Sequence, residues 1–528
     1  MKIPGLDVDF AALPAPVPVW HAQVTAQQWQ AAASAVCEAG GRLLALWAGS
    51  AIESEAAGAQ STGAGAVCAA YVTLEGVFWL ALPLECNAGE QFYPDLTPAF
   101  PVASRMQRAA ADLSGIRAQG AQDQRPWLNH GAWAHDHFPL LQGGIQLPQV
   151  TPGALEDYPF VRVEGDGVHE IAVGPVHAGI IEPGHFRFSV VGERVLRLEQ
   201  RLGYTHKGIE QRMTQLVPLQ AHRLAGRVSG DSTVAYAWAY CMALESATQT
   251  TIARRAAWLR ALMLERERIA NHLGDLGALG NDAAFAFALA QFSRLREDWL
   301  RASKAAFGHR LMMDCIVPGG VQSDLDSAHI APMVASCRTL ETEVRRLCDI
   351  FEAHAGLQDR FLSTGRVAPA LAARLGLTGM AGRASSQAWD VRCDHPFVPY
   401  DGLSVAMATR SNGDVAARVA VRFDEVLESL RLIQRMLAEL PEGSVRSDVA
   451  LPEGSARGAG WVEGWRGEIF VALELESGSQ GSRIARCHLH DPSWQNWPAL
   501  EHAILGNIVP DFPLINKSFN LSYSGQDL

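Results

Sequence analysis

The 528-residue sequence has nine cysteines, but no two of them are separated by only two residues. Closely spaced cysteine pairs commonly hold structural zinc and iron–sulfur clusters. We therefore expect no metal or cofactor bound by this chain alone. The odd number and scattered positions of the cysteines are also typical of a reducing compartment.

Long hydrophobic runs are missing as well. No window of about 18 apolar residues occurs, so we expect no segment that spans a membrane directly. The first ten residues carry charges where a signal peptide would have an apolar core. These features predict a cytoplasmic polypeptide, and work at a membrane would require another subunit to hold it there.

The sequence also has no excess of positive charge. The 44 Lys and Arg residues are outnumbered by 56 Asp and Glu residues, which gives a net charge of −12. Such a surface repels phosphate backbones, so nucleic acid is not expected as a partner. The 48% hydrophobic and 19% charged residues are typical of folded soluble proteins, and the length suggests two to four domains.

The pattern of short apolar runs predicts a small α/β domain over residues 1–150. Its expected elements are a helix at Gln27–Glu38 and strands at Arg42–Trp47, Ala66–Leu74 and Val77–Leu84. The remaining residues, 151–528, predict a mainly helical domain with a small β portion. The fold class that we predict is therefore α+β with several domains.

Within the second domain, residues 158–195 look strand-like and residues 208–310 look mostly helical. Apolar residues recur at helical spacing over 252–279, and a further helix is expected at Ala416–Leu440. In the tail, 460–528, a strand is expected at Glu468–Leu475, and the rest is expected to be irregular, ending in Leu514–Leu528.

Histidines and carboxylates gather in a few segments. His177, Glu182 and His185 lie between Gly and Pro turns, where a functional site and a polar loop are both open interpretations. His488 and His490 alternate as in a strand, and we interpret them as part of a polar surface strand.

One face of the long predicted helix combines Glu265, Arg268 and His272 at helical spacing, and Asp282 follows on the same helix. A carboxylate and a histidine can exchange protons near neutral pH. The alternative is an internal ion-pair network that holds helices together.

Several motifs resemble one known family. They are Gly174–Phe188 (GPVHAGIIEPGHFRF), Tyr204–Glu210 (YTHKGIE), Glu265–Leu273 (ERERIANHL), Val317–Val321 (VPGGV), Thr409–Arg418 (TRSNGDVAAR), Leu440–Gly443 (LPEG) and Val462–Glu468 (VEGWRGE). They resemble the large subunit of membrane-bound, energy-converting nickel–iron hydrogenases, such as formate hydrogenlyase, and the related 49-kDa subunit of complex I. Residues 151–528 carry this resemblance.

The N-terminal residues 1–150 resemble the 30-kDa subunit of complex I, fused ahead of the large subunit. The residues that indicate this are Asp112–Ile116 (DLSGI) and Gln124–Gly131 (QRPWLNHG). The resemblance therefore covers nearly the whole chain.

The nickel ligands of the family are absent from this sequence. The resemblance implies two C-x-x-C pairs, and the corresponding positions are Ser229, Ser232, Ser522 and Gly525. Nickel and iron need soft thiolate ligands, whereas a serine hydroxyl stays protonated and binds such metals poorly. We therefore expect no nickel–iron site and no hydrogenase activity.

The quinone chemistry of the complex I relatives is altered too. Gly230 stands where the resemblance implies a tyrosine for the quinone headgroup, and Asp282 matches the aspartate of a proton-delivering pair. The histidine position of that pair is ambiguous. Glu182 or His185 could fill it, and His177 matches the first histidine of the segment.

The resemblance implies an oxidoreductase subunit of a membrane-attached assembly of the NADH dehydrogenase and hydrogenase type. Its expected partners are a small subunit that carries an iron–sulfur cluster and ion-translocating membrane subunits, on the inner face of the cell membrane. Quinone is a candidate ligand, and the resemblance to NADH dehydrogenase also implies NAD binding. The alternative is a structural or coupling scaffold without a small-molecule site.

Overall fold

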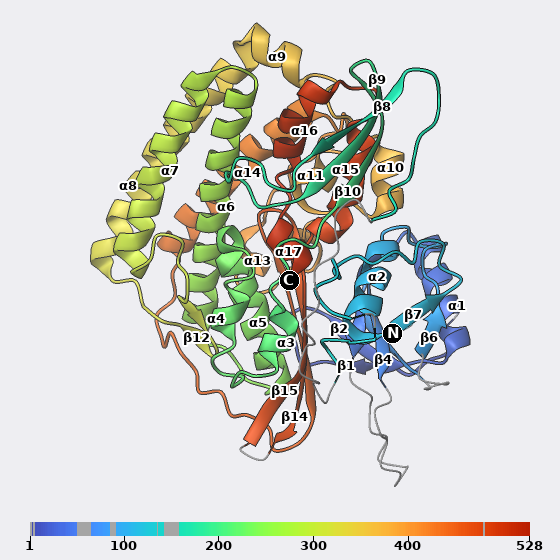
Figure 1. Cartoon of the computed structure of the whole chain (residues 1–528). Helices are drawn as coiled ribbons and strands as arrows, with labels where there is room; N and C mark the ends of the chain where they lie inside the picture. Colours follow the sequence, from blue (N-terminus) through green and yellow to red (C-terminus); the bar gives the residue numbers. More distant parts are fainter. Residues whose placement is uncertain are drawn as a thin grey trace.

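A computed structural model of the chain describes residues 3, 6–49, 65–84, 91–134, 136–141, 158–478 and 481–528. It contains many helices, several small sheets and one extensive buried core, which confirms the predicted α+β class with several units. The expected domain boundary at residues 150 and 151 lies outside the described residues. Figure 1 shows the N-terminal unit beside the base of the larger helical unit.

The N-terminal unit is built on a five-stranded sheet of order β1-β2-β5-β4-β3, in which only β2 and β5 are parallel. The strands are β1 (Ala11–Ala12), β2 (Val19–Gln23), β3 (Arg42–Gly49), β4 (Ala66–Thr73) and β5 (Gly76–Pro83). Helices α1 (Ala26–Glu38) and α2 (Ala103–Ser114) accompany it, with a small parallel pair, β6 (Gln91–Pro94) and β7 (Ile116–Gln119). The predicted helix and three strands of this region are confirmed.

A local signal explains the start of α1. The Thr25 side chain accepts a hydrogen bond from the Gln28 backbone N–H, and the Gln28 side chain accepts one from the Thr25 N–H. This capping box satisfies two backbone donors that the first turn of a helix leaves unpaired.

The next unit begins with an antiparallel sheet of order β10-β9-β8. Its strands are β8 (Val168–Val173), β9 (His185–Val191) and β10 (Arg194–Arg201), as the strand-like sequence predicted. Short helices α3 (Ile209–Met213) and α4 (His222–Ala225) and a 3₁₀ turn (Gly230–Ser232) lead into α5 (Thr233–Ala247), whose fifteen residues are all buried.

Long helices form the bulk of the molecule. They are α6 (Arg254–Asp282), α7 (Ala286–Phe307), α8 (Ser327–Ala353) and α14 (Val415–Ala438). Shorter elements connect them: β11 (Ile316–Val317), β12 (Gly320–Val321), α9 (Ala355–Phe361), α10 (Pro369–Leu375), α11 (Gly379–Arg383), α12 (Val391–Asp394) and α13 (Tyr400–Leu403). The helices predicted at 252–279 and 416–440 are confirmed as α6 and α14.

The last sheet packs its glycines against α5. It contains β13 (Ala456–Glu463), β14 (Glu468–Gly478) and β15 (Gly481–His490), all antiparallel. The chain then forms α15 (Ser493–Ala503), a 3₁₀ turn (Val509–Asp511), α16 (Phe512–Phe519) and α17 (Tyr523–Asp527). The prediction of an irregular tail after Leu475 was wrong, because β15, α15, α16 and α17 form there. The short helices α16 and α17 are held by tertiary contacts rather than by a repeated apolar pattern.

The two units meet where β3 lies against β15. The ring of Trp47 stacks on His488 with centroids 4.7 Å apart, and the Gln495 side chain donates to the Leu44 carbonyl. Arg42 forms an ion pair with Glu468 across the same joint. The prediction that the His488 strand lies on the surface was therefore wrong, since the N-terminal unit covers it.

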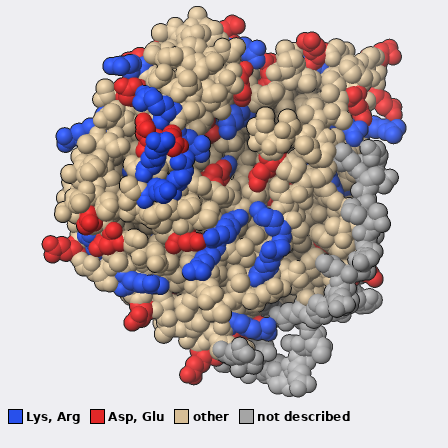
Figure 2. Space-filling view, turned by 60° about the vertical axis from the view of Figure 1, so that its left-hand side comes forward, with Lys and Arg blue, Asp and Glu red and all other residues tan. Residues whose placement is uncertain are grey.

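The outer helices carry charges of both signs. Figure 2 shows basic and acidic side chains intermixed on this face. Pairs one helical turn apart, Arg301 with Glu297 on α7 and Arg345 with Glu341 on α8, are part of this pattern. Within the described ranges, none of the helices combines the length and the apolar character needed to cross a membrane.

Candidate functional site at the degenerate metal positions

The four positions that the resemblance assigns to nickel ligands are buried and lie close together. Ser229 precedes the 3₁₀ turn before α5, Ser232 ends that turn, and Ser522 caps the N-terminus of α17. The hydroxyl oxygens of Ser522 and Ser229 lie 3.1 Å apart, and Ser522 accepts the Gly525 N–H at 2.9 Å. Two segments far apart in sequence therefore form one centre.

An ion pair contacts the two serines on the α5 side of this cluster, Ser229 and Ser232. Arg466 binds Asp231 through both terminal nitrogens, and Asp231 accepts the Ser229 hydroxyl at 2.6 Å. Arg466 also donates to the Ser232 hydroxyl at 3.2 Å. Burial opposes ionisation of Asp231, but the charge and hydrogen bonds of Arg466 outweigh it and hold the Asp231 pKa at about 2.

A second carboxylate closes the centre beside Gly525. A Cβ atom at Gly525 would lie 2.4 Å from an Asp491 carboxylate oxygen, so a side chain at this position would require a rearrangement. That oxygen accepts the Tyr236 hydroxyl at 2.7 Å, and the other accepts the Ser493 backbone N–H. Asp491 is therefore firmly positioned by protein donors.

These residues do not fit a nickel–iron centre. The side chains at the ligand positions are neutral hydroxyls, the Asp231 carboxylate beside them is paired with Arg466, and the guanidinium of Arg466 adds a positive charge that repels a metal cation. Within the described part of the chain, no group of three or more His, Cys, Asp or Glu side chains is arranged to hold a metal ion.

Of the three candidates in and beside the β8–β9 connection, Glu182 contacts the centre. Glu182 accepts the backbone N–H of Ser524, in α17, at 3.1 Å. His177 contacts the Gly184 carbonyl at 2.7 Å. The buried His185 contacts the Gly174 carbonyl, so these contacts tie both histidines to their own segment.

His272 lies in a buried charge network between α6 and α14. Its Nε2 is 2.8 Å from Glu425, and burial lowers the His272 pKa although Glu425 raises it. Arg383 also binds Glu425, at 2.8 Å. The network further includes Glu265, Arg268, Asp390, Arg392 and Glu463. These contacts agree with the second interpretation of this helix face, an internal ion-pair network that holds helices together.

Asp282 is exposed at the C-terminal end of α6. Neighbouring residues nevertheless remove part of the water around its carboxylate, which raises the Asp282 pKa, and the charge of Lys517 opposes that shift. Among the described residues, no hydrogen bond or ion pair joins Asp282 to His177 or His272, so the structure does not bring these candidates together.

Sequence reasoning missed the charged residues of the centre. Arg466 lies in the motif Val462–Glu468, and Asp231 lies between Ser229 and Ser232, yet the sequence predicts a role only for the serine and glycine positions. Asp275 was missed as well; it is buried on α6 and pairs with Arg422 and Lys517. The sequence feature that could have revealed these residues is the presence of charged side chains beside the serines at the ligand positions and in the family motifs.

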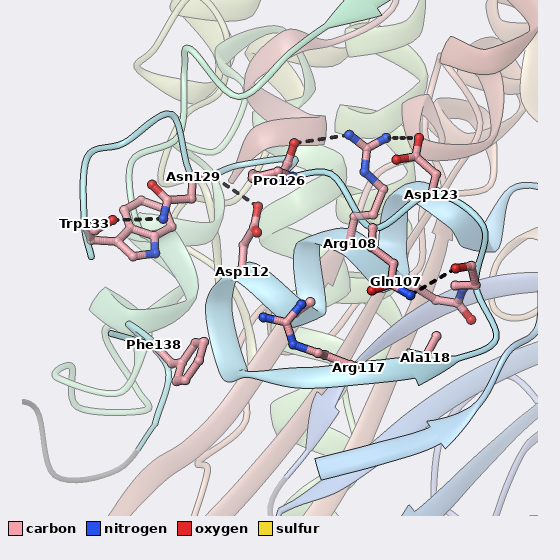
Figure 3. A pocket seen from close by; sticks show the side chains of 13 residues that line it. Gln107, Arg108, Asp112, Arg117, Ala118, Asp123, Pro126, Asn129, Trp133 and Phe138 are labelled. Atoms are coloured by element: carbon pink, nitrogen blue, oxygen red, sulfur yellow. Dashed lines mark hydrogen bonds and ion pairs between the residues drawn. The ribbon is translucent and has the colours of Figure 1, made fainter. Parts of the chain in front are cut away.

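The N-terminal unit has a separate cavity of about 220 Å³ (Figure 3). Asp112 borders it, and one of its carboxylate oxygens accepts the backbone N–H groups of Trp127, Leu128 and Asn129 at 2.7–3.0 Å. The two sequence motifs of this unit are therefore bound to each other, which gives their co-occurrence a structural reason.

The chain matches two family models. The model of the 49-kDa subunit of respiratory-chain NADH dehydrogenase matches residues 279–456, and that of the 30-kDa subunit matches residues 22–143.

Curated relatives match over most of their length. Formate hydrogenlyase subunit 5 of Escherichia coli is 30% identical over 85% of this chain and 79% of its own length. The carbon monoxide-induced hydrogenase of Rhodospirillum rubrum is 30% identical over 67% of this chain and 97% of its own. The C/D subunit of the NADH-quinone oxidoreductase of Bacteroides thetaiotaomicron is 31% identical over 74% of this chain and 76% of its own.

Among solved structures, a chain of the archaeal membrane-bound sulfane sulfur reductase, a respiratory membrane complex, shares the fold. Its TM-score is 0.63 at 23% identity, and the match covers 69% of this chain and 99% of that one.

Proposed function

The chain belongs to the family of complex I 49-kDa subunits and membrane-bound hydrogenase large subunits, with a 30-kDa-type unit fused ahead. From this premise we propose that it is the large subunit of a membrane-attached, complex I-like assembly whose nickel–iron centre has been lost. The Arg466–Asp231 ion pair carries this proposal, because it sets fixed opposite charges against two of the four positions, Ser229 and Ser232, at which thiolates would be needed to hold the metals.

The proposed partners are a small subunit with an iron–sulfur cluster and membrane subunits that move ions, with the chain peripheral on the inner face of the cell membrane. The names of relatives support this, since they include a membrane-bound hydrogenase and quinone oxidoreductase subunits. No metal or redox group is proposed for this chain itself.

A quinone or another acceptor is the proposed redox ligand. Gly230 is exposed next to the centre, and a side chain built there would meet no atom within 4 Å. An open surface beside a polar centre leaves room for a headgroup. Asp282 and Glu182 are the proposed proton-handling groups, because both are exposed carboxylates on elements that contact the centre or its surroundings.

The second candidate is a coupling scaffold without a small-molecule site. The ion pair favours it, because Asp231 and Arg466 satisfy each other and the surrounding hydroxyls. In this case the chain would transmit structural changes between its partners without taking up electrons.

Purification of the native assembly and measurement of its ion translocation test the proposal. We expect the iron–sulfur and membrane subunits to copurify, and Asp282→Asn to impair coupled ion translocation. Asp349→Asn is the matched control, because Asp349 is also an exposed carboxylate at a distance from the centre, on α8. A chain that purifies without membrane partners would refute the proposal, and full ion translocation in Asp282→Asn would favour the scaffold.

A further inference from the structure

The serine-lined centre is continuous with a line of charged and polar groups that leads toward the surface. Arg466, which binds Asp231, also donates from Nε to the Asn520 carbonyl at 2.6 Å. The Asn520 side chain donates to Asp275 at 2.7 Å. Asp275 in turn lies 3.1 Å from the Lys517 ammonium. Each step is a hydrogen bond or an ion pair; Arg466 and Asp275 are buried, whereas the Asp231 side chain is 35% exposed.

Lys517, the last residue of this line, acts electrostatically on two carboxylates, Asp275 and Asp282. Lys517 is in the last turn of α16, which packs against α6 (Figure 1). Asp275 and Asp282 are seven residues apart on α6, so they lie on the same face, about 10 Å apart along the helix axis. The charge of Lys517 acts on both carboxylates.

The two carboxylates differ in their surroundings. The Asp275 side chain is 3% exposed, and it is also bound by Arg422 and Asn520, so it keeps a positive partner if the ammonium leaves. Asp282 is exposed and has no ion pair among the described residues. The Lys517 side chain is itself 31% exposed and is long enough to change partners.

We propose that Asp231, Arg466, Asn520, Asp275 and Lys517 form an electrostatic relay that connects the centre with the surface at Asp282. Lys517 is its two-position element, paired with Asp275 in one state and with Asp282 in the other. The relay transfers no atoms between molecules. A change in the charge or position of Asp231 alters the strength of the ion pair between Asp275 and Lys517. Energetic coupling between two sites requires such an element with two states, and each site must be able to shift the equilibrium between these states.

This inference deepens the proposed function, because it gives the metal-free centre a route to the periphery. The proposed function fails if the native assembly contains stoichiometric nickel. The relay fails independently, if Lys517 does not respond to Asp231.

The chain offers a direct probe of Lys517, because it has only four lysines: Lys2, Lys207, Lys304 and Lys517. Reductive methylation with ¹³C-formaldehyde gives one dimethyl-lysine NMR signal for each, and Lys517→Arg identifies the signal of interest. We expect Asp231→Asn to shift the Lys517 signal. No hydrogen bond or ion pair among the described residues joins the two groups, but the charge of Lys517 also acts on Asp231 through space, so the route through Asn520 needs a test of its own. The signal of Lys304, on α7, serves as the internal control and stays in place.

The middle link supplies the second variant. Asn520 has a left-handed backbone (φ 44°), so Asn520→Gly removes the amide without backbone strain. In an Asn520→Gly background, Asp231→Asn should move the Lys517 signal by less than half as much, because only the through-space part of the effect is left. Asp275→Asn and Asp282→Asn should each move it, whereas Asp349→Asn should not.

Two results would overturn the relay. One is an unmoved Lys517 signal in folded Asp231→Asn protein. The other is a shift that persists unchanged in the Asn520→Gly background, because the connection would then not run through Asn520. If Asp231→Asn does not fold, Ser229→Ala, which removes one hydrogen bond to Asp231, replaces it with the same expected direction.

Discussion

Glu267 shows how a single buried carboxylate is used where a helix begins. It lies on α6 and accepts the backbone N–H groups of Val234 and Ala235, in the first turn of α5, at 2.7 and 3.2 Å. It thereby satisfies donors that a helix start leaves free. Burial nevertheless raises the Glu267 pKa to about 8, since these hydrogen bonds only partly compensate for lost hydration.

Because this pKa is higher than in the unfolded chain, the native state holds the proton more tightly. The contribution of Glu267 to stability is therefore fully present below its ordinary pKa of 4.5 and is lost as the pH rises to about 8. The slope from one such group is at most about 1.4 kcal/mol per pH unit. We predict that Glu267→Gln, whatever its cost at pH 5, gains stability relative to the wild type between pH 5 and 8. Urea unfolding at both pH values measures this, and an unchanged difference would contradict it.

The central ion pair leads to a second prediction at this scale. Arg466→Met leaves Asp231 without its cation, and we expect a loss of about 1–3 kcal/mol in unfolding free energy. Asp231→Asn alone should also destabilise. The double variant should lose less than the sum of the two, because the groups interact directly. Urea unfolding of the three variants measures this, and strictly additive losses would show that the pair contributes nothing.

At the scale of elements, β13 approaches α5 so closely that glycine is required. A Cβ atom at Gly460 would lie 1.9 Å from the Ala239 carbonyl oxygen, whereas one at Gly230 would meet nothing within 4 Å. We predict that Gly460→Ala destabilises by at least about 1–3 kcal/mol. Gly230→Ala, the control, should change stability by less than about 0.5 kcal/mol. Thermal or urea unfolding of both variants measures this, and equal effects would disprove the close packing.

The same scale explains what the sequence could and could not predict. Helices α6 and α14 repeat apolar residues over many turns, so their pattern reveals them. Helix α17 has only five residues, and its formation depends on the Ser522 cap and on packing. No local sequence pattern therefore predicts it. The motif positions predicted where the centre would form, but the pairing of Arg466 with Asp231, 235 residues away, required the folded chain.

At the scale of the whole molecule, the N-terminal unit and the helical unit are held together by specific polar contacts. Arg42 and Glu468 bridge the joint, and Trp461 donates to the same carboxylate at 3.0 Å. The buried position of His488 follows from this docking, which no property of its own strand could reveal. The centre, by contrast, lies wholly within the helical unit.

The central claim is that this family member has lost its nickel–iron centre and works in a membrane-attached assembly without it. The most direct test is metal analysis of the purified native complex, with hydrogen uptake assayed on the same sample. The account predicts no nickel above background, no hydrogen uptake, and iron only in the amount that partner clusters require. Nickel near one equivalent per chain, together with hydrogen uptake, would contradict it.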